Sequence, residues 1–222
     1  MKTIQVVSGQ INYTLKINNM KKLTVTAIKK INKNLDYFFN SATDQQIKKG
    51  LTWYKNANKE ANIIAKKYNL DVYKVSQVIS ALSPRNKWVQ NIKDADKVCQ
   101  AYKLGLQPED IKVCTFHINK FKAFNILGNG LNITDKSLKT YNFVNNIANL
   151  DDNFLTVDIW HLRACFFNDI NISSASIGRV AYEQIKKLTI KKANKLGLKG
   201  FEFQTIIWLS AQTIFTNQRK NK

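Results

Sequence analysis

Residues that interrupt helices are scarce in this sequence. The chain has 222 residues but only two prolines and eight glycines. A β-sandwich of this length needs many short strands joined by turns rich in glycine and proline, so that fold is disfavoured. Hydrophobic residues make up 44% of the chain, which is enough for a buried core. The sequence therefore predicts an all-α fold, built as one domain or as two closely joined lobes.

Amphipathic patterns separated by polar or glycine-containing breaks locate the helices. Thr43 and Asp71 stand directly before two apolar stripes and are good N-cap residues, and Pro84 ends the second helix. The segment 201–215 is apolar nearly all round, which predicts a buried core helix. Before that core helix, serines within residues 173–176 offer N-caps for a helix that runs to Leu196. The helix after Thr43 covers residues 44–68, and further helices are predicted at residues 23–39, 88–102, 115–127 and in two parts within 137–163.

The first twenty residues have a different pattern. Their apolar residues alternate around Ser8 and Gly9, which favours a small N-terminal β hairpin or an extended arm over residues 1–20. The N-terminus has no apolar signal core, and no run of about eighteen apolar residues occurs in the chain. We therefore expect a cytoplasmic, monomeric protein without a membrane span.

The strongest bulk signal is a large positive charge. Lys and Arg number 35 against 15 Asp and Glu, for a net charge of +20. Such a balance predicts attraction to phosphate backbones or anionic membranes, whereas the alternative is a basic protein without a polyanion partner. The abundance of Lys, Asn and Ile is also typical of an AT-rich genome, which accounts for some of this charge.

The residues that often bind metals show no suitable spacing. Cys99, Cys114 and Cys165 are far apart, which indicates buried free thiols rather than a zinc site or a disulfide framework. His117 and His161 are also too far apart in sequence to suggest a metal pair. No metal and no cofactor is expected.

Two charged residues near the middle of the chain are candidates for catalysis. Asp158 follows the apolar segment 155–157 and precedes the helical pattern of residues 159–163. It can cap that helix, which is a purely structural role, or act as a partly desolvated base or charge-stabilising group. Lys139, near a predicted helix start, is either a solvated surface group or, where its surroundings favour the neutral amine, a nucleophile. The spacing leaves both alternatives open.

One corner between two predicted helices combines cations, an amide and an aromatic ring in the segment Ser83-Pro84-Arg85-Asn86-Lys87-Trp88. Such a mixture suits a loop that meets phosphates and bases. The alternative is an ordinary helix–turn–helix corner with Trp88 in the core. We favour a core position for Trp88 and a functional role for Arg85.

The order of these segments resembles the helix–hairpin–helix DNA glycosylases of the endonuclease III type. The segments that carry the resemblance span about residues 75–165 and are Ala81–Arg85, Lys122–Ile126, Lys139-Thr140, Val157-Asp158 and Arg163. The C-terminal segment GFEFQTIIW is similar to small phage-encoded relatives. Four features differ from that family. The glycine-rich hairpin is replaced by Thr134-Asp135-Lys136-Ser137, and Pro84-Arg85 replaces the usual Ala-Gln. Trp160 stands where the family has a histidine, and the C-terminal cysteine cluster is absent.

The resemblance implies a two-lobed helical glycosylase-like domain over residues 21–222, with a central lobe of about residues 71–157. It implies excision of a modified or mismatched base flipped from double-stranded DNA. In that family the residue matched by Asp158 stabilises the cationic sugar or activates a nucleophile, and the residue matched by Lys139 attacks the sugar in members with abasic-site lyase activity. The expected DNA contacts are Arg85, Asn86, Lys87, Lys122, Lys136, Ser137, Thr140 and Arg163.

Three other functions remain open at this point. One is a member of the same superfamily that makes or attacks hypermodified pyrimidines in phage DNA. Another is a non-catalytic DNA-binding module in which Asp158 only caps a helix. A third is a helical RNA-binding protein.

Overall fold

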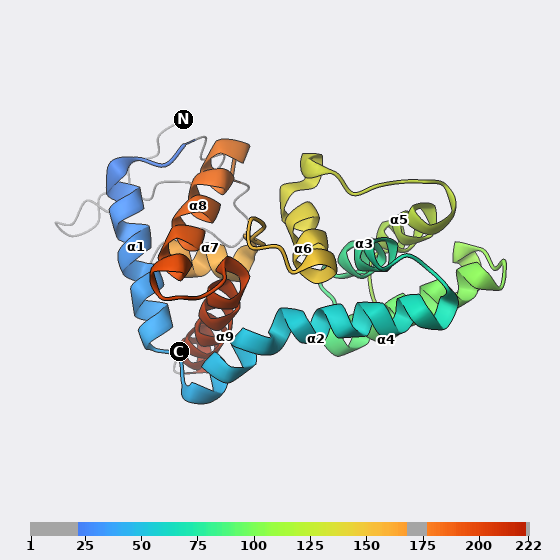
Figure 1. Cartoon of the computed structure of the whole chain (residues 1–222), viewed down its shortest axis with the longest axis horizontal. Helices are drawn as coiled ribbons and strands as arrows, with labels where there is room; N and C mark the ends of the chain where they lie inside the picture. Colours follow the sequence, from blue (N-terminus) through green and yellow to red (C-terminus); the bar gives the residue numbers. More distant parts are fainter. Residues whose placement is uncertain (1–21, 168–176, 221–222) are drawn as a thin grey trace.

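The computed structural model describes residues 22–167 and 177–220, and every secondary-structure element in these two ranges is a helix. The prediction of an all-α fold is thereby confirmed, while the predicted arm or hairpin of residues 1–20 lies outside the described residues. In chain order (Figure 1) the helices are α1 (Val25–Asn40), α2 (Asp44–Tyr68), α3 (Val72–Leu82), α4 (Trp88–Lys103), η1 (Pro108–Asp110), α5 (His117–Gly128), η2 (Asp135–Ser137), α6 (Leu138–Asn149), α7 (Ile159–Cys165), α8 (Arg179–Lys195) and α9 (Gly200–Lys220).

Side-chain caps determine where two of these helices begin. Thr43 Oγ1 accepts a hydrogen bond from the backbone N–H of Gln46, whose Oε1 in turn accepts from the backbone N–H of Thr43, which closes a capping box at α2. Asp71 Oδ1 accepts from the backbone N–H of Lys74 at 2.9 Å and caps α3. Both N-caps lie where the sequence predicts them.

Helix α8 begins later than predicted. Its N-cap is Gly178, which is extended and accepts the first helical hydrogen bond from Tyr182 N–H at 3.0 Å. The predicted serine caps within 173–176 lie outside the described residues. Because glycine supplies no side-chain oxygen, α8 starts without a side-chain cap.

The helices enclose two hydrophobic cores. One core is formed mainly by α2 to α6, and the other by α1, α7, α8, α9 and the segment 155–157. In Figure 1, α2 runs along the lower edge from one group of helices to the other, and α6 lies between them. Helix α9 contributes to both cores, because Phe201 belongs to the first and Phe203 to the second. The fold therefore brings residues from both cores together along α2, α6 and α9.

The closest approach between α2 and α9 requires a glycine. A Cβ on Gly50 would lie within 3.0 Å of the Ile206 backbone nitrogen and closer still to the Ile206 side chain. Because real Cβ atoms do not approach backbone atoms so closely, any larger residue would push the two helices apart. This close contact lies three residues before Trp53 on α2 and two residues before Trp208 on α9, so it brings the two tryptophans near one another.

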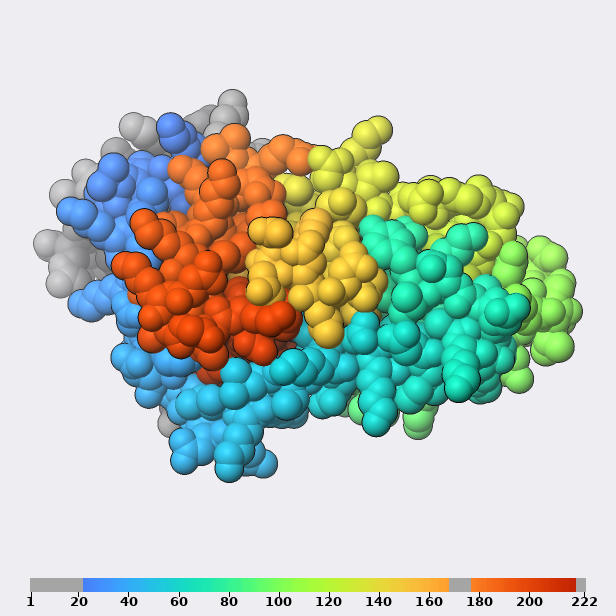
Figure 2. Space-filling model, viewed as in Figure 1, coloured from blue at the N-terminus to red at the C-terminus, as the bar shows by residue number. Residues whose placement is uncertain are grey.

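Figure 2 shows the surface of the same face, where α6 and the segment after it lie between the α8–α9 side and the α3–α4 side. Within the two described ranges, no helix combines the length and the hydropathy that crossing a bilayer requires.

Candidate functional site

The backbone before Asp158 is fixed by hydrogen bonds from buried side chains. Leu155 donates its N–H to Asn142 Oδ1 at 3.1 Å. The hydroxyl of Tyr182 donates to Leu155 O and accepts from Val157 N–H, both at 3.1 Å. An extended buried segment has no ladder partners of its own, so these side chains satisfy its polar groups. The backbone that leads into Asp158 is therefore held in place by Asn142 and Tyr182.

Asp158 is the N-cap of α7, and its carboxyl group is largely desolvated. Its Oδ1 accepts from the backbone N–H of His161 at 2.9 Å, which confirms the capping geometry. Burial raises the pKa of the Asp158 carboxyl above its ordinary value; the N–H of His161, the charge of Lys139 and the N–H of Trp160 offset only part of this effect. The carboxyl group of Asp158 thus caps α7 and also lies where burial disfavours its ionised form.

Lys139 lies in the first turn of α6, and its ammonium group is close enough to stabilise the ionised form of Asp158 electrostatically. It is exposed and makes no direct ion pair with any residue that the structure describes. Its amine is therefore free to turn towards a bound molecule while it remains near the carboxylate.

Asp158 and Lys139 line one pocket of about 570 Å³. All four tryptophans of the chain line the same pocket. The ring centroid of Trp53 lies 4.8 Å from that of Trp88 and 5.6 Å from that of Trp208. Aromatic faces of this kind bind flat rings by stacking, and the volume falls within the usual range of about 300–1,000 Å³ for small-molecule sites. The remaining aromatic members of the wall are Tyr54, Phe143 and Trp160.

Three buried polar atoms on residues that line this pocket have no hydrogen-bond partner in the described part of the chain. They are Asn91 Oδ1, Gln204 Oε1 and Trp208 Nε1. The amide of Asn91 cannot simply turn over, because its Nδ2 donates to Ile79 O at 3.0 Å. Buried polar groups are almost always paired in folded proteins, so orphaned atoms at one pocket indicate a polar ligand or water. These unpaired atoms belong to residues of the pocket wall, and each of them is covered from solvent.

The turn between α3 and α4 forms part of the rim. Arg85 has a φ of 56°, a left-handed conformation that is uncommon for a residue other than glycine and costs free energy. Its guanidinium lies 5.5 Å from the centre of the exposed Phe116 ring. The turn is held by Asp94, whose Oδ2 accepts from Asn86 Nδ2 at 2.8 Å and from Cys114 N–H at 2.9 Å. Asp94 therefore ties together the two loops that present Arg85 and Phe116.

The pocket brings together half of the predicted site residues: Asp158, Lys139, Arg85, Asn86 and Lys87. Trp88, for which we favoured a core position, is half-buried and both packs against the first core and lines the pocket. The other predicted DNA contacts do not line the pocket. Lys136 and Ser137 are exposed in η2, and Lys122 and Thr140 are half-buried on α5 and α6. The guanidinium of Arg163 lies 4.8 Å from the centre of the Trp160 ring.

The far wall of the pocket was missed by the sequence analysis. Gln204, Trp208 and Gln212 lie one turn apart along α9, a helix predicted only as buried core. That helix is buried as predicted over residues 200–207. Two glutamines and a tryptophan at i, i+4 and i+8 form a polar stripe along an apolar helix, and this signal could have found them.

The described residues offer no cluster of side chains that could hold a metal ion at the candidate site. Within residues 22–167 and 177–220, no three His, Cys, Asp or Glu side chains lie together in a metal-binding arrangement. The cysteines are free, and Cys99 and Cys165 are buried as predicted. Cys114 was predicted to be buried but is exposed, because it lies in the loop before α5.

Comparison with known proteins gives a family but no function. No curated protein and no solved structure matches the chain significantly. A family model described as a family of unknown function (DUF7178) matches residues 17–215, which include every residue that lines the pocket. The match covers most of the sequence, and the chain belongs to the DUF7178 family.

Proposed function

We propose that this protein is a DNA glycosylase that excises a modified or mismatched base after the base has left the duplex. The observation that supports it most is that Asp158 and Lys139 line a pocket together with all four tryptophans. A flipped base needs flat surfaces for stacking and polar atoms for its edge, and the pocket offers both. The charged pair would then meet the sugar at the point where the base is attached.

In this proposal, the carboxylate of Asp158 acts on the sugar. When the glycosidic bond breaks, the electron pair leaves with the base and positive charge develops on the sugar ring. A carboxylate beside that charge stabilises the transition state, and the effect is larger in a site that excludes water. The raised pKa of Asp158 indicates such a desolvated position. The ionised carboxylate therefore gains more from the developing cation than it would in bulk water.

Lys139 would decide which product forms. If its neutral amine attacks C1′, a carbon–nitrogen bond forms as the bond to the base breaks, and opening of the sugar ring gives a Schiff base that leads to strand cleavage. If water attacks instead, the product is an intact abasic site and Lys139 serves as a phosphate contact. The absence of a direct ion pair to Lys139 in the described residues is compatible with either role.

The partner in this proposal is double-stranded DNA bound by a monomer, and the finer fold is a two-lobed helix–hairpin–helix arrangement. Two observations support that arrangement. The pocket is lined by residues from helices of both hydrophobic cores. In addition, α5, η2 and α6 follow one another where the sequence resemblance expects the hairpin, with Lys136 and Ser137 exposed between the two helices.

A non-catalytic DNA-binding module is the second candidate. The observation in its favour is the 2.9 Å hydrogen bond from His161 N–H to Asp158 Oδ1, since a cap accounts for an aspartate at this position without any chemistry. In that case the aromatic pocket would hold a flipped or terminal base without breaking its bond to the sugar.

A base-release screen tests the proposal. Duplexes that each carry one modified or mismatched base are incubated with excess protein and analysed with and without alkali. We expect one or a few of them to be cleaved, with alkali required only if water is the nucleophile. The Asp158→Asn variant is the matched control and should release no base while binding the same duplex. Release of no base from any duplex, with equal binding by both proteins, would favour the non-catalytic module.

A further inference from the structure

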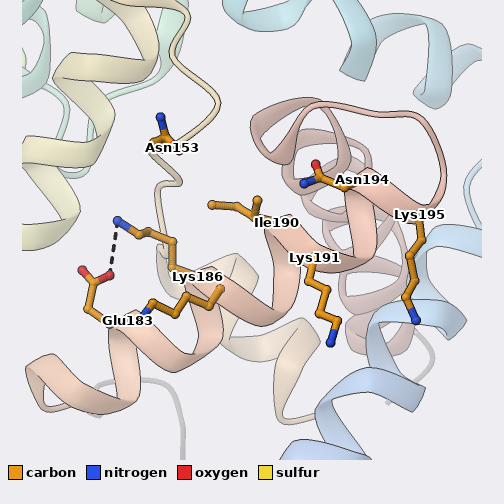
Figure 3. A pocket seen from close by; sticks show the side chains of 8 residues that line it. Asn153, Glu183, Lys186, Ile190, Lys191, Asn194 and Lys195 are labelled. Atoms are coloured by element: carbon orange, nitrogen blue, oxygen red, sulfur yellow. Dashed lines mark ion pairs between the residues drawn. The ribbon is translucent and has the colours of Figure 1, made fainter.

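A second hollow lies along the surface of α8, beside the loop after α6. Its volume is about 670 Å³, and seven of its eight lining residues come from α8. Asn153, from the loop after α6, is the one lining residue that lies off that helix (Figure 3). The members on α8 are Glu183, Lys186, Lys187, Ile190, Lys191, Asn194 and Lys195. They repeat at three and four residues, so one continuous face of the helix forms the hollow.

The hollow carries positive charge that acidic neighbours do not neutralise. Lys186 pairs with Glu183 at 3.2 Å, as Figure 3 shows. Asp152, next to Asn153 in the loop, is engaged by Lys199 at 3.4 Å. The lining lysines without an ion pair in the described ranges are Lys187, Lys191 and Lys195.

These three lysines repel one another along the helix. Lys187 and Lys191 are four residues apart, as are Lys191 and Lys195, and like charges at this spacing disfavour a helix. Lys191 and Lys195 extend in the same direction from α8 in Figure 3. A solvated lysine face is common on a basic protein, but it does not usually line a hollow with two amide side chains, here Asn153 and Asn194. An anion in the hollow would relieve the repulsion.

The spacing fits a chain of phosphates better than a single anion. Eight residues separate Lys187 from Lys195, which corresponds to about 12 Å along the helix axis. Successive lysines are therefore about 6 Å apart, which is close to the separation of neighbouring phosphates along one strand, so the three lysines match about three phosphates. We propose that the α8 hollow is a second nucleic-acid contact, which binds the phosphodiester backbone of one strand away from the pocket of Asp158. The inference relies on the proposed function only for the identification of the nucleic acid as duplex DNA.

The test compares two variants with the same change in charge. The hollow variant carries Lys187→Gln, Lys191→Gln and Lys195→Gln. The control carries Lys48→Gln, Lys59→Gln and Lys66→Gln on α2, where the lysines are also exposed and make no ion pair with described residues. Circular dichroism establishes that both proteins are folded. Binding to a short undamaged duplex is then measured over a range of salt concentrations.

For the hollow variant we expect the slope of log K against log salt to fall by about 2 to 3 relative to the wild type, since each lost phosphate contact removes about 0.9. The affinity at about 0.1 M salt should fall about tenfold or more, and the control should change much less. Equal effects in the two variants would mean that only net charge matters, which would overturn the proposal. Inorganic tripolyphosphate and anionic phospholipid vesicles are added as competitors at equal phosphate concentration. Competition by either one as strong as that by duplex would also overturn it.

Base release is measured on the same preparations to separate the two proposals. None of the three lysines lines the pocket of Asp158, so single-turnover release at saturating protein should be unchanged in the hollow variant. If the wild type releases no base but the salt slopes differ as expected, the proposed glycosylase function fails and the α8 contact stands. If base release occurs and the slopes do not differ, the α8 contact alone fails.

Discussion

Replacing Asp158 by Asn should slow base release at least about 100-fold without weakening the fold. Asn is as good an N-cap as Asp, so the hydrogen bond from His161 N–H can be kept. The substitution removes a charge whose burial is unfavourable, as the raised pKa of Asp158 shows. A group whose pKa is higher in the folded state contributes stability below its unfolded pKa and loses that contribution as pH rises. At neutral pH the variant should therefore be at least as stable as the wild type.

Asp158→Ala provides the comparison that separates the cap from the charge. It removes the charge and also the acceptor for His161 N–H, so it should be less stable than Asp158→Asn by about 1 kcal/mol. For a chain of this length, that difference corresponds to about 2–4 °C in melting temperature. Base release should fall at least about 100-fold in both variants, or about 2.7 kcal/mol of transition-state stabilisation.

The assays are urea unfolding at pH 7 and pH 5, together with single-turnover base release. The stability advantage of Asp158→Asn over the wild type should be larger at pH 7, because more of the wild-type carboxyl is ionised there. Wild-type release rates in Asp158→Asn would show that the carboxylate is only a cap. A loss of stability in Asp158→Asn as large as that in Asp158→Ala would refute the argument from desolvation.

Three further changes test other parts of the site. Borohydride should trap a protein–DNA adduct in the wild type and none in Lys139→Gln, and base release without any wild-type adduct would identify water as the nucleophile. Arg85→Ala should weaken binding to duplex more than to a short single strand, because a side chain that enters the duplex offsets part of the unstacking free energy, and equal losses would indicate a simple phosphate contact. Burial lowers the pKa of His161 to about 4. As the pH falls below about 6.5, the histidine therefore becomes protonated in the unfolded chain before it does so in the folded protein. The free energy of unfolding should consequently decrease by up to about 3 kcal/mol between about pH 6.5 and pH 4. In urea unfolding over that pH range, His161→Gln should lack this decrease in the free energy of unfolding. A pH dependence identical to that of the wild type would contradict the lowered pKa of His161.

The helices and the charged half of the site could be predicted because their signals are local. Thr43, Asp71 and Asp158 each cap the helix that follows them. In each case the side chain accepts a hydrogen bond from the backbone N–H three residues further on, and such short-range hydrogen bonds depend little on the rest of the fold. Likewise, Arg85 belongs to a short corner whose composition alone marks it as a loop.

The aromatic half of the site could not be predicted, because it depends on contacts between distant segments. Trp53 and Trp208 are more than 150 residues apart, and each lies on an amphipathic or apolar helix whose pattern is explained by burial alone. They meet because Gly50 allows α2 and α9 to approach closely, and that contact is visible only in three dimensions. The unpartnered Oδ1 of Asn91 could not be predicted for the same reason. Its orientation is fixed by the hydrogen bond from Asn91 Nδ2 to Ile79 O on the preceding helix.

The placement of every tryptophan at one site makes the protein its own optical reporter. The structure describes all four indole rings, and all four line the pocket of Asp158. The tryptophan emission of the whole chain, excited at a wavelength that the eight tyrosines do not absorb, therefore comes from this site, with no background from tryptophans elsewhere. Stacking of a nucleobase against an indole quenches that emission, so occupancy of the pocket can be followed in unlabelled protein and in real time. Titration of individual modified nucleosides into the Asp158→Asn variant would then rank ligands by fluorescence alone, before any cleavable substrate is known.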